Sequence, residues 1–193
     1  MNNRKYLREL QKLCLTILQR HKHYIGNGKE KIHGILFDGA WLWEEYIDTL
    51  VSADFYHPKN KGGSGSQRLF NSHLGTKIGI VYPDFIGHNQ ENRIIGDAKY
   101  KPIQNIGNRD YLQVLAYMFR FNAKTGYYFY PNHKEIQDEV LYLNQGLSYE
   151  RDVQMREDIK VIKLGLSIPK AVRDYKEFSE GMKKAEQEFL GEI

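Results

Sequence analysis

The sequence predicts an α/β (α+β) fold in which helices flank a mixed β-sheet. Two observations predict it: apolar residues recur with helical spacing in four segments, and runs typical of strands lie between those segments. In chain order they give two helices, two strands, a helix, three strands and a last helix, which indicates a mixed sheet with helices packed on it. The 193 residues suffice for one domain of ordinary size.

Helical periodicity is clearest in the segments 7–18, 40–51, 108–120 and 172–189. In the second helix, the residues that fall on one side and are expected in the core are Trp43, Ile47, Leu50 and Val51. Asn108 is the expected N-cap of the third helix. The residues expected on its buried side are Leu112, Leu115, Ala116 and Phe119.

Strands are expected at residues 77–86, 93–100, 127–130, 139–143 and 160–168. The first two should form a hairpin across the polar turn 88–92. Before them, the Gly/Ser-rich stretch 58–66 is expected to be a flexible, basic loop.

Charge divides the chain into two expected parts. The net charge is +4, but residues 1–33 alone carry eight basic against two acidic residues, a local charge of +6. We therefore expect a basic, helical N-terminal segment, residues 1–33, followed by the sheet-containing domain, residues 34–193. A basic segment suits a polyanion such as nucleic acid, and it equally suits a solvated helix face.

Composition excludes several classes of protein. No stretch approaches the ~20 apolar residues of a membrane span, and the first residues lack the apolar core of a secretory signal. The single cysteine, Cys14, excludes an internal disulfide framework, and the seven histidines show no zinc-ligand spacing. A cytoplasmic protein with no membrane partner is expected.

The chemistry lies in two short segments, Tyr82-Pro83-Asp84-Phe85 and Ile95-Gly96-Asp97-Ala98-Lys99. Side chains alternate along a strand, so Asp97 and Lys99 share a face with Ile95. Burying such an unpaired charge costs several kcal/mol, so these groups must meet each other, water, a metal or a ligand. If the hairpin pairs as expected, Asp84 on the neighbouring strand can reach Asp97.

Two carboxylates beside a lysine suit Mg²⁺-assisted cleavage of a phosphodiester bond. Carboxylate and carbonyl oxygens bind this hard cation, and a bound cation polarises the phosphate and lowers the pKa of a water molecule. The lysine can orient or deprotonate that water or neutralise developing charge. The alternative is an ordinary surface salt bridge, worth ~0–1 kcal/mol.

These motifs resemble the PD-(D/E)xK nuclease superfamily, which has a restriction-endonuclease-like core. More closely, the segments 42–46, 97–101 and 110–117 resemble the McrC-like nuclease subunits of McrBC-type, modification-dependent restriction systems, related to LlaJI-type restriction proteins. The resemblance covers about residues 35–131. It implies that residues 34–193 form a PD-(D/E)xK nuclease domain and that the chain is a Mg²⁺-dependent DNA endonuclease, with Mn²⁺ expected to substitute.

The resemblance implies a role for each matching residue. Asp84, Asp97 and the backbone carbonyl of Ala98 would hold the metal, and Lys99 would be the catalytic lysine. Glu44 matches a helical glutamate that supports the metal or its water. Its neighbour Glu45 is the alternative if the register is shifted by one residue, and a solvent-facing pair of glutamates is the structural alternative for both.

Three further residues resemble contacts near the DNA. Gln113 and Tyr117 stand four apart on one helix face and resemble the Gln-x-x-x-Tyr motif of RecB-like nucleases. The alternative is a core tyrosine beside a capped glutamine. Lys101 is a candidate phosphate contact or an ordinary exposed lysine.

The resemblance also implies partners: double-stranded DNA and a McrB-like AAA+ GTPase. Cutting two strands takes two active sites or two successive nicks, so a homo-oligomer is one possible arrangement. Other functions stay open, namely a catalytically silent DNA-binding or scaffold subunit, a PD-(D/E)xK repair enzyme or exonuclease, and a protein-interaction module whose Asp/Lys pair is a salt bridge.

Overall fold

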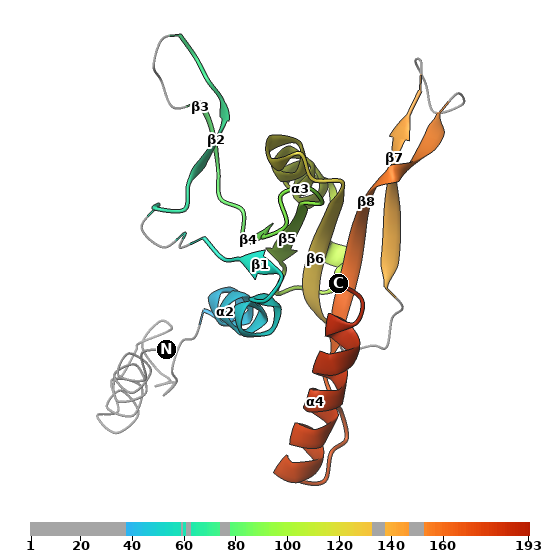
Figure 1. Ribbon diagram of the computed structural model, residues 1–193. Helices are drawn as coiled ribbons and strands as arrows, with labels where there is room; N and C mark the ends of the chain where they lie inside the picture. Colours follow the sequence, from blue (N-terminus) through green and yellow to red (C-terminus); the bar gives the residue numbers. More distant parts are fainter. Residues whose placement is uncertain (1–37, 59, 61–62, 74–77, 133–137, 147–152) are drawn as a thin grey trace, which may run out of the picture. The chain divides into compact units, whose positions relative to one another are not determined.

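A six-stranded mixed sheet forms the centre of the unit Gly39–Ile193, with the strand order β1-β4-β5-β6-β8-β7 (Figure 1). The strands β5, β6 and β8 run parallel, whereas β4 and β7 pair antiparallel with their neighbours on either side, and β1 pairs antiparallel with β4. Their bounds are β1 Phe55–Tyr56, β4 Phe85–Gly87, β5 Ile94–Ala98, β6 Thr125–Asn132, β7 Glu139–Gln145 and β8 Gln154–Ser167.

The structure is a computed structural model that describes residues 38–58, 60, 63–73, 78–132, 138–146 and 153–193. The predicted basic helical segment, residues 1–33, lies outside the described residues, so that prediction stays open. None of the helices within the described ranges is long and apolar enough to cross a membrane.

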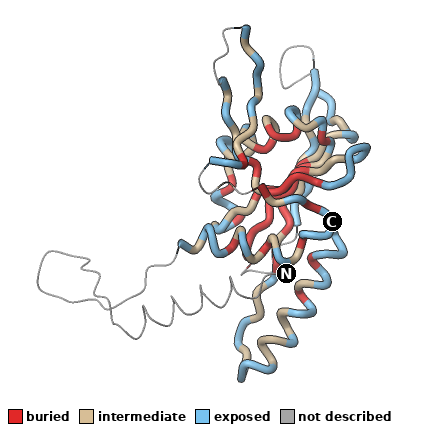
Figure 2. Tube along the Cα trace, turned by 60° about the vertical axis from the view of Figure 1, so that its left-hand side comes forward, coloured by how far each residue is buried: buried red, intermediate tan, exposed pale blue. Residues whose placement is uncertain are grey.

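Three helices of the described chain flank the sheet, which confirms the predicted α/β fold with a mixed sheet. α2 (Gly39–Val51) and α4 (Tyr175–Leu190) pack on one face, and α3 (Asn108–Phe121) covers the other. Burial is concentrated in the strands between these layers (Figure 2). The last predicted helix is confirmed as α4, which begins after Asp174, whose side chain accepts the Glu177 amide.

The aromatic run in β6 supplies both halves of the core, because alternate residues point to opposite faces. Tyr127 and Phe129 lie in the cluster under α2 and α4, and Tyr128 and Tyr130 lie in the cluster under α3. A strand covered on both faces is expected to be apolar throughout, and β6 is. The predicted strands 127–130 and 139–143 are confirmed within the longer β6 and β7, and the predicted strand 160–168 is confirmed as the second half of β8, which ends one residue earlier.

The predicted second helix is confirmed as α2. It begins at Gly39. Of the expected residues, Trp43, Ile47 and Val51 are buried, and Leu50 is partly buried against the same cluster. The Trp43 indole Nε1 donates to the Phe129 carbonyl at 2.9 Å, which ties α2 to the end of the parallel ladder.

The predicted first strand, residues 77–86, is wrong as one element. Its first part is β3 (Ile78–Val81), which pairs with β2 (Gln67–Phe70) in a separate two-stranded antiparallel sheet. Pro83 has no amide to donate and holds its predecessor extended, so the chain breaks before β4. β2 was missed because it follows directly on the Gly/Ser-rich stretch.

The second part of the hairpin is as predicted. β4 pairs antiparallel with β5 across the turn 88–92, with Phe85 opposite Gly96 and Ile86 opposite Ile95. The expected faces of β5 are also observed, because Ile95 packs under α3 and Ile94 packs with the opposite cluster.

The predicted buried side of α3 is correct only in part: Leu115 and Ala116 are partly buried, whereas Leu112 and Phe119 are exposed. Val114, Tyr117 and Met118 are buried, whereas Leu112 is 69% and Phe119 is 91% exposed. The N-cap is Gly107 rather than Asn108. The helix instead faces β5 with a side that carries polar residues. Hydrophobic periodicity selects the most apolar side of a helix and so does not predict this orientation.

Candidate functional site

The break in the strand at Pro83 places Asp84 next to the segment Asp97-Ala98-Lys99. Because Phe85 pairs with Gly96, the next antiparallel position brings Asp84 beside Asp97. The Asp84 carboxylate Oδ2 accepts the Ala98 amide at 2.9 Å. Asp84 and Asp97 are therefore neighbours, as expected, although Asp84 lies just before β4 rather than within it.

Asp97 is a buried carboxylate in the middle of the sheet, with 1% of its surface exposed. Its Oδ1 has no hydrogen-bond partner among the described residues, and its Oδ2 lies 2.5 Å from Lys99 Nζ. Burial first, and then the nearby charge of Asp84, raise the pKa of Asp97. Burial and the charge of Glu44 raise the pKa of Asp84 in the same way.

Lys99 reaches three acceptors from the strand end. Besides Asp97, its Nζ lies 3.5 Å from Asp110 Oδ1 and 3.4 Å from Gln113 Oε1. Burial alone lowers the pKa of Lys99, but the carboxylates, Asp97 foremost, outweigh it and raise the pKa above the ordinary value. Lys99 is thus held in its charged form.

Glu44 approaches the same site from α2. Its charge acts on Asp84, and its Oε1 lies 3.6 Å from His57 Nε2. Glu45 is exposed and accepts the Trp41 indole Nε1 at 3.1 Å, so the structure places Glu44 rather than Glu45 near the carboxylates.

His57 is a site neighbour that the sequence analysis missed. Its Nδ1 lies 2.7 Å from the Asp84 carbonyl, and its ring packs against Phe85 with 5.1 Å between centroids. The histidines show no zinc-ligand spacing, and no sequence pattern indicates that a single histidine just after β1 reaches the site.

Gln113 and Tyr117 extend the site along α3. Gln113 Nε2 donates to the Tyr117 hydroxyl at 2.6 Å, and that hydroxyl donates to the Tyr82 carbonyl at 3.1 Å. With the contact from Lys99 to Gln113, these bonds link β5 through α3 to the segment that precedes Asp84. The two residues share a helix face beside Lys99, as expected, and Tyr117 is also a core residue.

The strand predicted at residues 93–100 is shorter in the structure, and Lys101 lies in the segment that follows it. β5 ends at Ala98, and the Lys101 amide turns back to the Lys99 carbonyl at 2.8 Å, so the strand does not continue through Tyr100 and Lys101. The Lys101 ammonium group is 2.7 Å from Asp110 Oδ2. Asp110 lies three residues before Gln113 and therefore on the same helix face, which is the signal in the sequence that it belongs to the site.

The donor set fits a hard cation without forming a complete cage. No group of three or more His, Cys, Asp or Glu side chains arranged to hold a metal occurs within the described ranges. However, the buried Oδ1 of Asp97 lacks a partner there, and Asp84 lies beside it. Two carboxylates and a nearby carbonyl suit Mg²⁺, because this ion keeps several water ligands.

One family model matches the sequence, that of the McrBC 5-methylcytosine restriction system component, over residues 1–131. The chain belongs to this family. The matched span of the family contains all of the candidate site residues discussed above and ends inside β6. A comparison with curated proteins gives no match.

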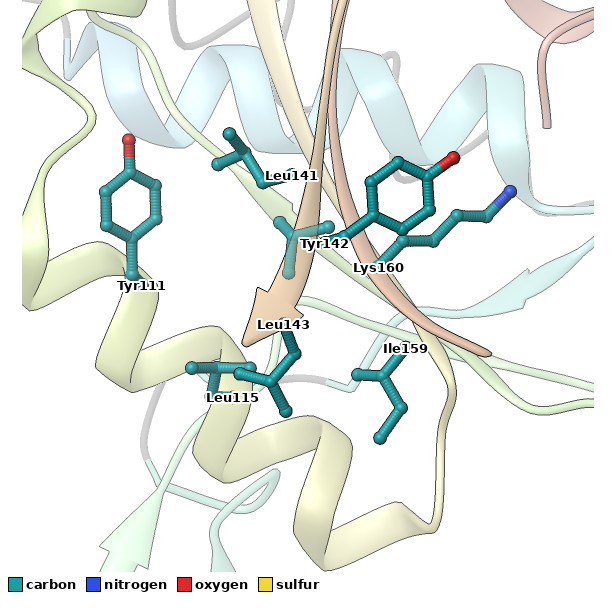
Figure 3. A pocket seen from close by; sticks show the side chains of 8 residues that line it. Tyr111, Leu115, Leu141, Tyr142, Leu143, Ile159 and Lys160 are labelled. Carbon is teal, nitrogen blue, oxygen red and sulfur yellow. The ribbon is translucent and has the colours of Figure 1, made fainter. Parts of the chain in front are cut away.

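An apolar pocket of about 150 Å³ lies apart from these acidic groups, between α3 and the strands β7 and β8 (Figure 3). Tyr111 and Leu115 line it from the helix, and Leu141 and Leu143 line it from β7. It has no carboxylate among its lining residues, so the candidate site of this family member is the polar cluster at the end of β5.

Proposed function

We propose that the chain is the nuclease component of a McrBC-type restriction system and hydrolyses phosphodiester bonds of double-stranded DNA with Mg²⁺. The observation that carries the proposal is the convergence of Asp84, Asp97 and Lys99 within the span matched by the family. A buried pair of carboxylates whose pKa values are both raised, chiefly by burial, is costly for the fold, which favours a functional explanation.

In this proposal Asp84, Asp97 and the Ala98 carbonyl hold Mg²⁺, with Glu44 in support from α2. The bound ion supplies a Lewis acid for the phosphate and a more acidic water. Lys99 stays charged between carboxylates, so it neutralises or orients an anion rather than accepting a proton. Gln113 and Tyr117 hold Lys99 and the Tyr82 carbonyl in place, and Lys101 is a candidate phosphate contact.

The proposed partners follow from the same family. Membership in a McrBC system suggests a McrB-like partner, which we propose is an AAA+ GTPase that brings modified DNA to this chain.

Purified protein incubated with supercoiled plasmid tests the function. Metal-dependent nicking or cutting is expected with Mg²⁺ or Mn²⁺ and not with EDTA, and it should be lost in Lys99→Ala and Asp97→Asn. If nothing is cut, a McrB-like partner with GTP is added. DNA binding without cleavage even then would favour a catalytically silent DNA-binding subunit, and full cutting by folded Asp97→Asn protein would overturn the site.

A further inference from the structure

Lys99 lies between two anionic contacts on different elements. On its own strand it meets Asp97, with 2.5 Å between Nζ and Oδ2. On α3 it meets Asp110 Oδ1 at 3.5 Å and the Gln113 amide oxygen at 3.4 Å. Asp97 is also a proposed cation ligand through Oδ1, which lacks a hydrogen-bond partner within the described part of the chain, and a cation bound there would weaken the attraction of the same carboxylate for Lys99.

Resting on the proposed function, we propose that Asp110 is a positioning residue: with Gln113 it forms a second seat that keeps Lys99 in the site when Asp97 binds a divalent cation. The seat is defined as Asp110 and Gln113. It explains why a third carboxylate, one that is not a proposed metal ligand, stands beside the lysine.

The Asp110 carboxylate is itself fixed from two sides. Its Oδ2 accepts the Gly107 amide at 2.9 Å and lies 2.7 Å from Lys101 Nζ, which leaves Oδ1 toward Lys99. The position in the first turn of α3 favours a negative charge, because the helix amides there point outward. Partial burial raises the pKa of Asp110, but the bonds from Lys101 and Gly107 outweigh it and lower the pKa.

Gln113 is held in an orientation that serves the seat. Its Nε2 donates to the Tyr117 hydroxyl at 2.6 Å, which points the amide oxygen toward Lys99. An isolated glutamine could rotate its amide by half a turn, but this bond opposes rotation. The seat is therefore built before any cation arrives.

The test measures how fast the Lys99 amine reacts with an acetylating reagent, with and without Mg²⁺, read by mass spectrometry and normalised to the exposed Lys176 in the same molecule. In the unmodified sequence, Mg²⁺ should change Lys99 labelling by less than about twofold, because the seat replaces Asp97. In Asp110→Asn, Mg²⁺ should raise it about three- to tenfold, since one partly buried ion pair is then missing.

Two control variants separate this role from a structural one. Asp174→Asn removes a carboxylate at the N-terminus of another helix, α4, far along the chain from the site, and should leave Lys99 labelling unchanged. Lys101→Met removes the other cation on Asp110 and should also leave Lys99 protected in Mg²⁺. Thermal melting shows whether Asp110→Asn remains folded.

The proposal is overturned if Mg²⁺ does not raise Lys99 labelling in folded Asp110→Asn protein, or if Asp174→Asn gives the same increase. The outcome is independent of cleavage. A Mg²⁺-dependent change in Lys99 labelling without any plasmid cutting would contradict the nuclease function and support the seat. Plasmid cutting without that labelling change would contradict only the seat.

Discussion

Asp97 on β5 lies directly beside Tyr128 on β6 in the parallel ladder, and each has a buried oxygen without a hydrogen-bond partner among the described residues. The oxygens are the carboxylate Oδ1 and the phenol hydroxyl. Burial first, and the charge of Asp97 next, raise the pKa of Tyr128. Two adjacent core strands of the described chain therefore each carry an unsatisfied buried oxygen at the candidate site.

Replacing Tyr128 by Phe should leave the free energy of unfolding unchanged or raise it by up to ~1 kcal/mol, because it removes an unsatisfied buried hydroxyl. Tyr117→Phe is the matched comparison, since that hydroxyl has bonds to Gln113 and to the Tyr82 carbonyl. It should cost about 1–3 kcal/mol. Denaturant unfolding of both variants measures the difference, and an equal loss would contradict it.

Stability of the metal-free protein should fall as pH rises. Asp84 and Asp97 have raised pKa values in the native state, so the native state binds more protons than the unfolded chain. The free energy of unfolding therefore falls from about pH 4, the unfolded carboxyl pKa, upward through the raised native values. Asp110, with a lowered pKa, acts oppositely only near and below that unfolded value.

Denaturant unfolding across pH checks this dependence, and Asp97→Asn should reduce its slope. If Mg²⁺ binds the ionised pair, its stabilising effect should grow over the same pH range. A metal-free stability that rises steadily from about pH 5 to pH 8 would contradict the shifted carboxylates.

Gly96→Ala should destabilise the fold by about 1–3 kcal/mol, because a methyl group there overpacks the core. An added Cβ would lie 2.6 Å from the Phe129 ring and 3.1 Å from the Phe85 Cβ. Gly191→Ala is the control, since its Cβ would meet nothing closer than 3.4 Å, and it should stay within ~0.5 kcal/mol. Thermal melting compares the two.

The rotation of α3 can be tested with two truncations. Val114→Ala removes buried methyl groups and should cost about 1–3 kcal/mol, whereas Leu112→Ala, on the exposed side, should change stability by less than ~0.5 kcal/mol. Chemical unfolding of both variants decides the matter. A larger loss of stability in Leu112→Ala than in Val114→Ala would instead support the buried side that the apolar pattern predicted.

The sequence predicts the layers well because burial follows simple periods. The residues 40–51 show a helical stripe and the aromatic run in β6 marks a central strand, and both are observed. Asp84, Asp97 and Lys99 could be predicted to meet, because hairpin register and strand alternation are local. The roles of these residues in catalysis remain proposals.

The features that could not be predicted depend on contacts between distant segments of the chain. Tyr117 and Gln113 set the rotation of α3 through polar bonds, which hydrophobic periodicity does not register. β3 pairs with β2 rather than with β5, because Pro83 interrupts the strand and the two short strands then pair with each other. His57 and Asp110 reach the site from other elements, so no residue spacing within one segment predicts their positions.

The pairing of β6 has a consequence for how the chain is made. β6 lies between β5, which precedes it, and β8, which is synthesised after it, and Tyr127 and Phe129 also pack in the cluster that contains residues of α4. A chain of residues 1–131, the span shared with the family, lacks β8 and α4 and would therefore leave β6 as an apolar open edge. The candidate site should take its final form only late in synthesis, and a chain cut at that boundary should aggregate rather than fold.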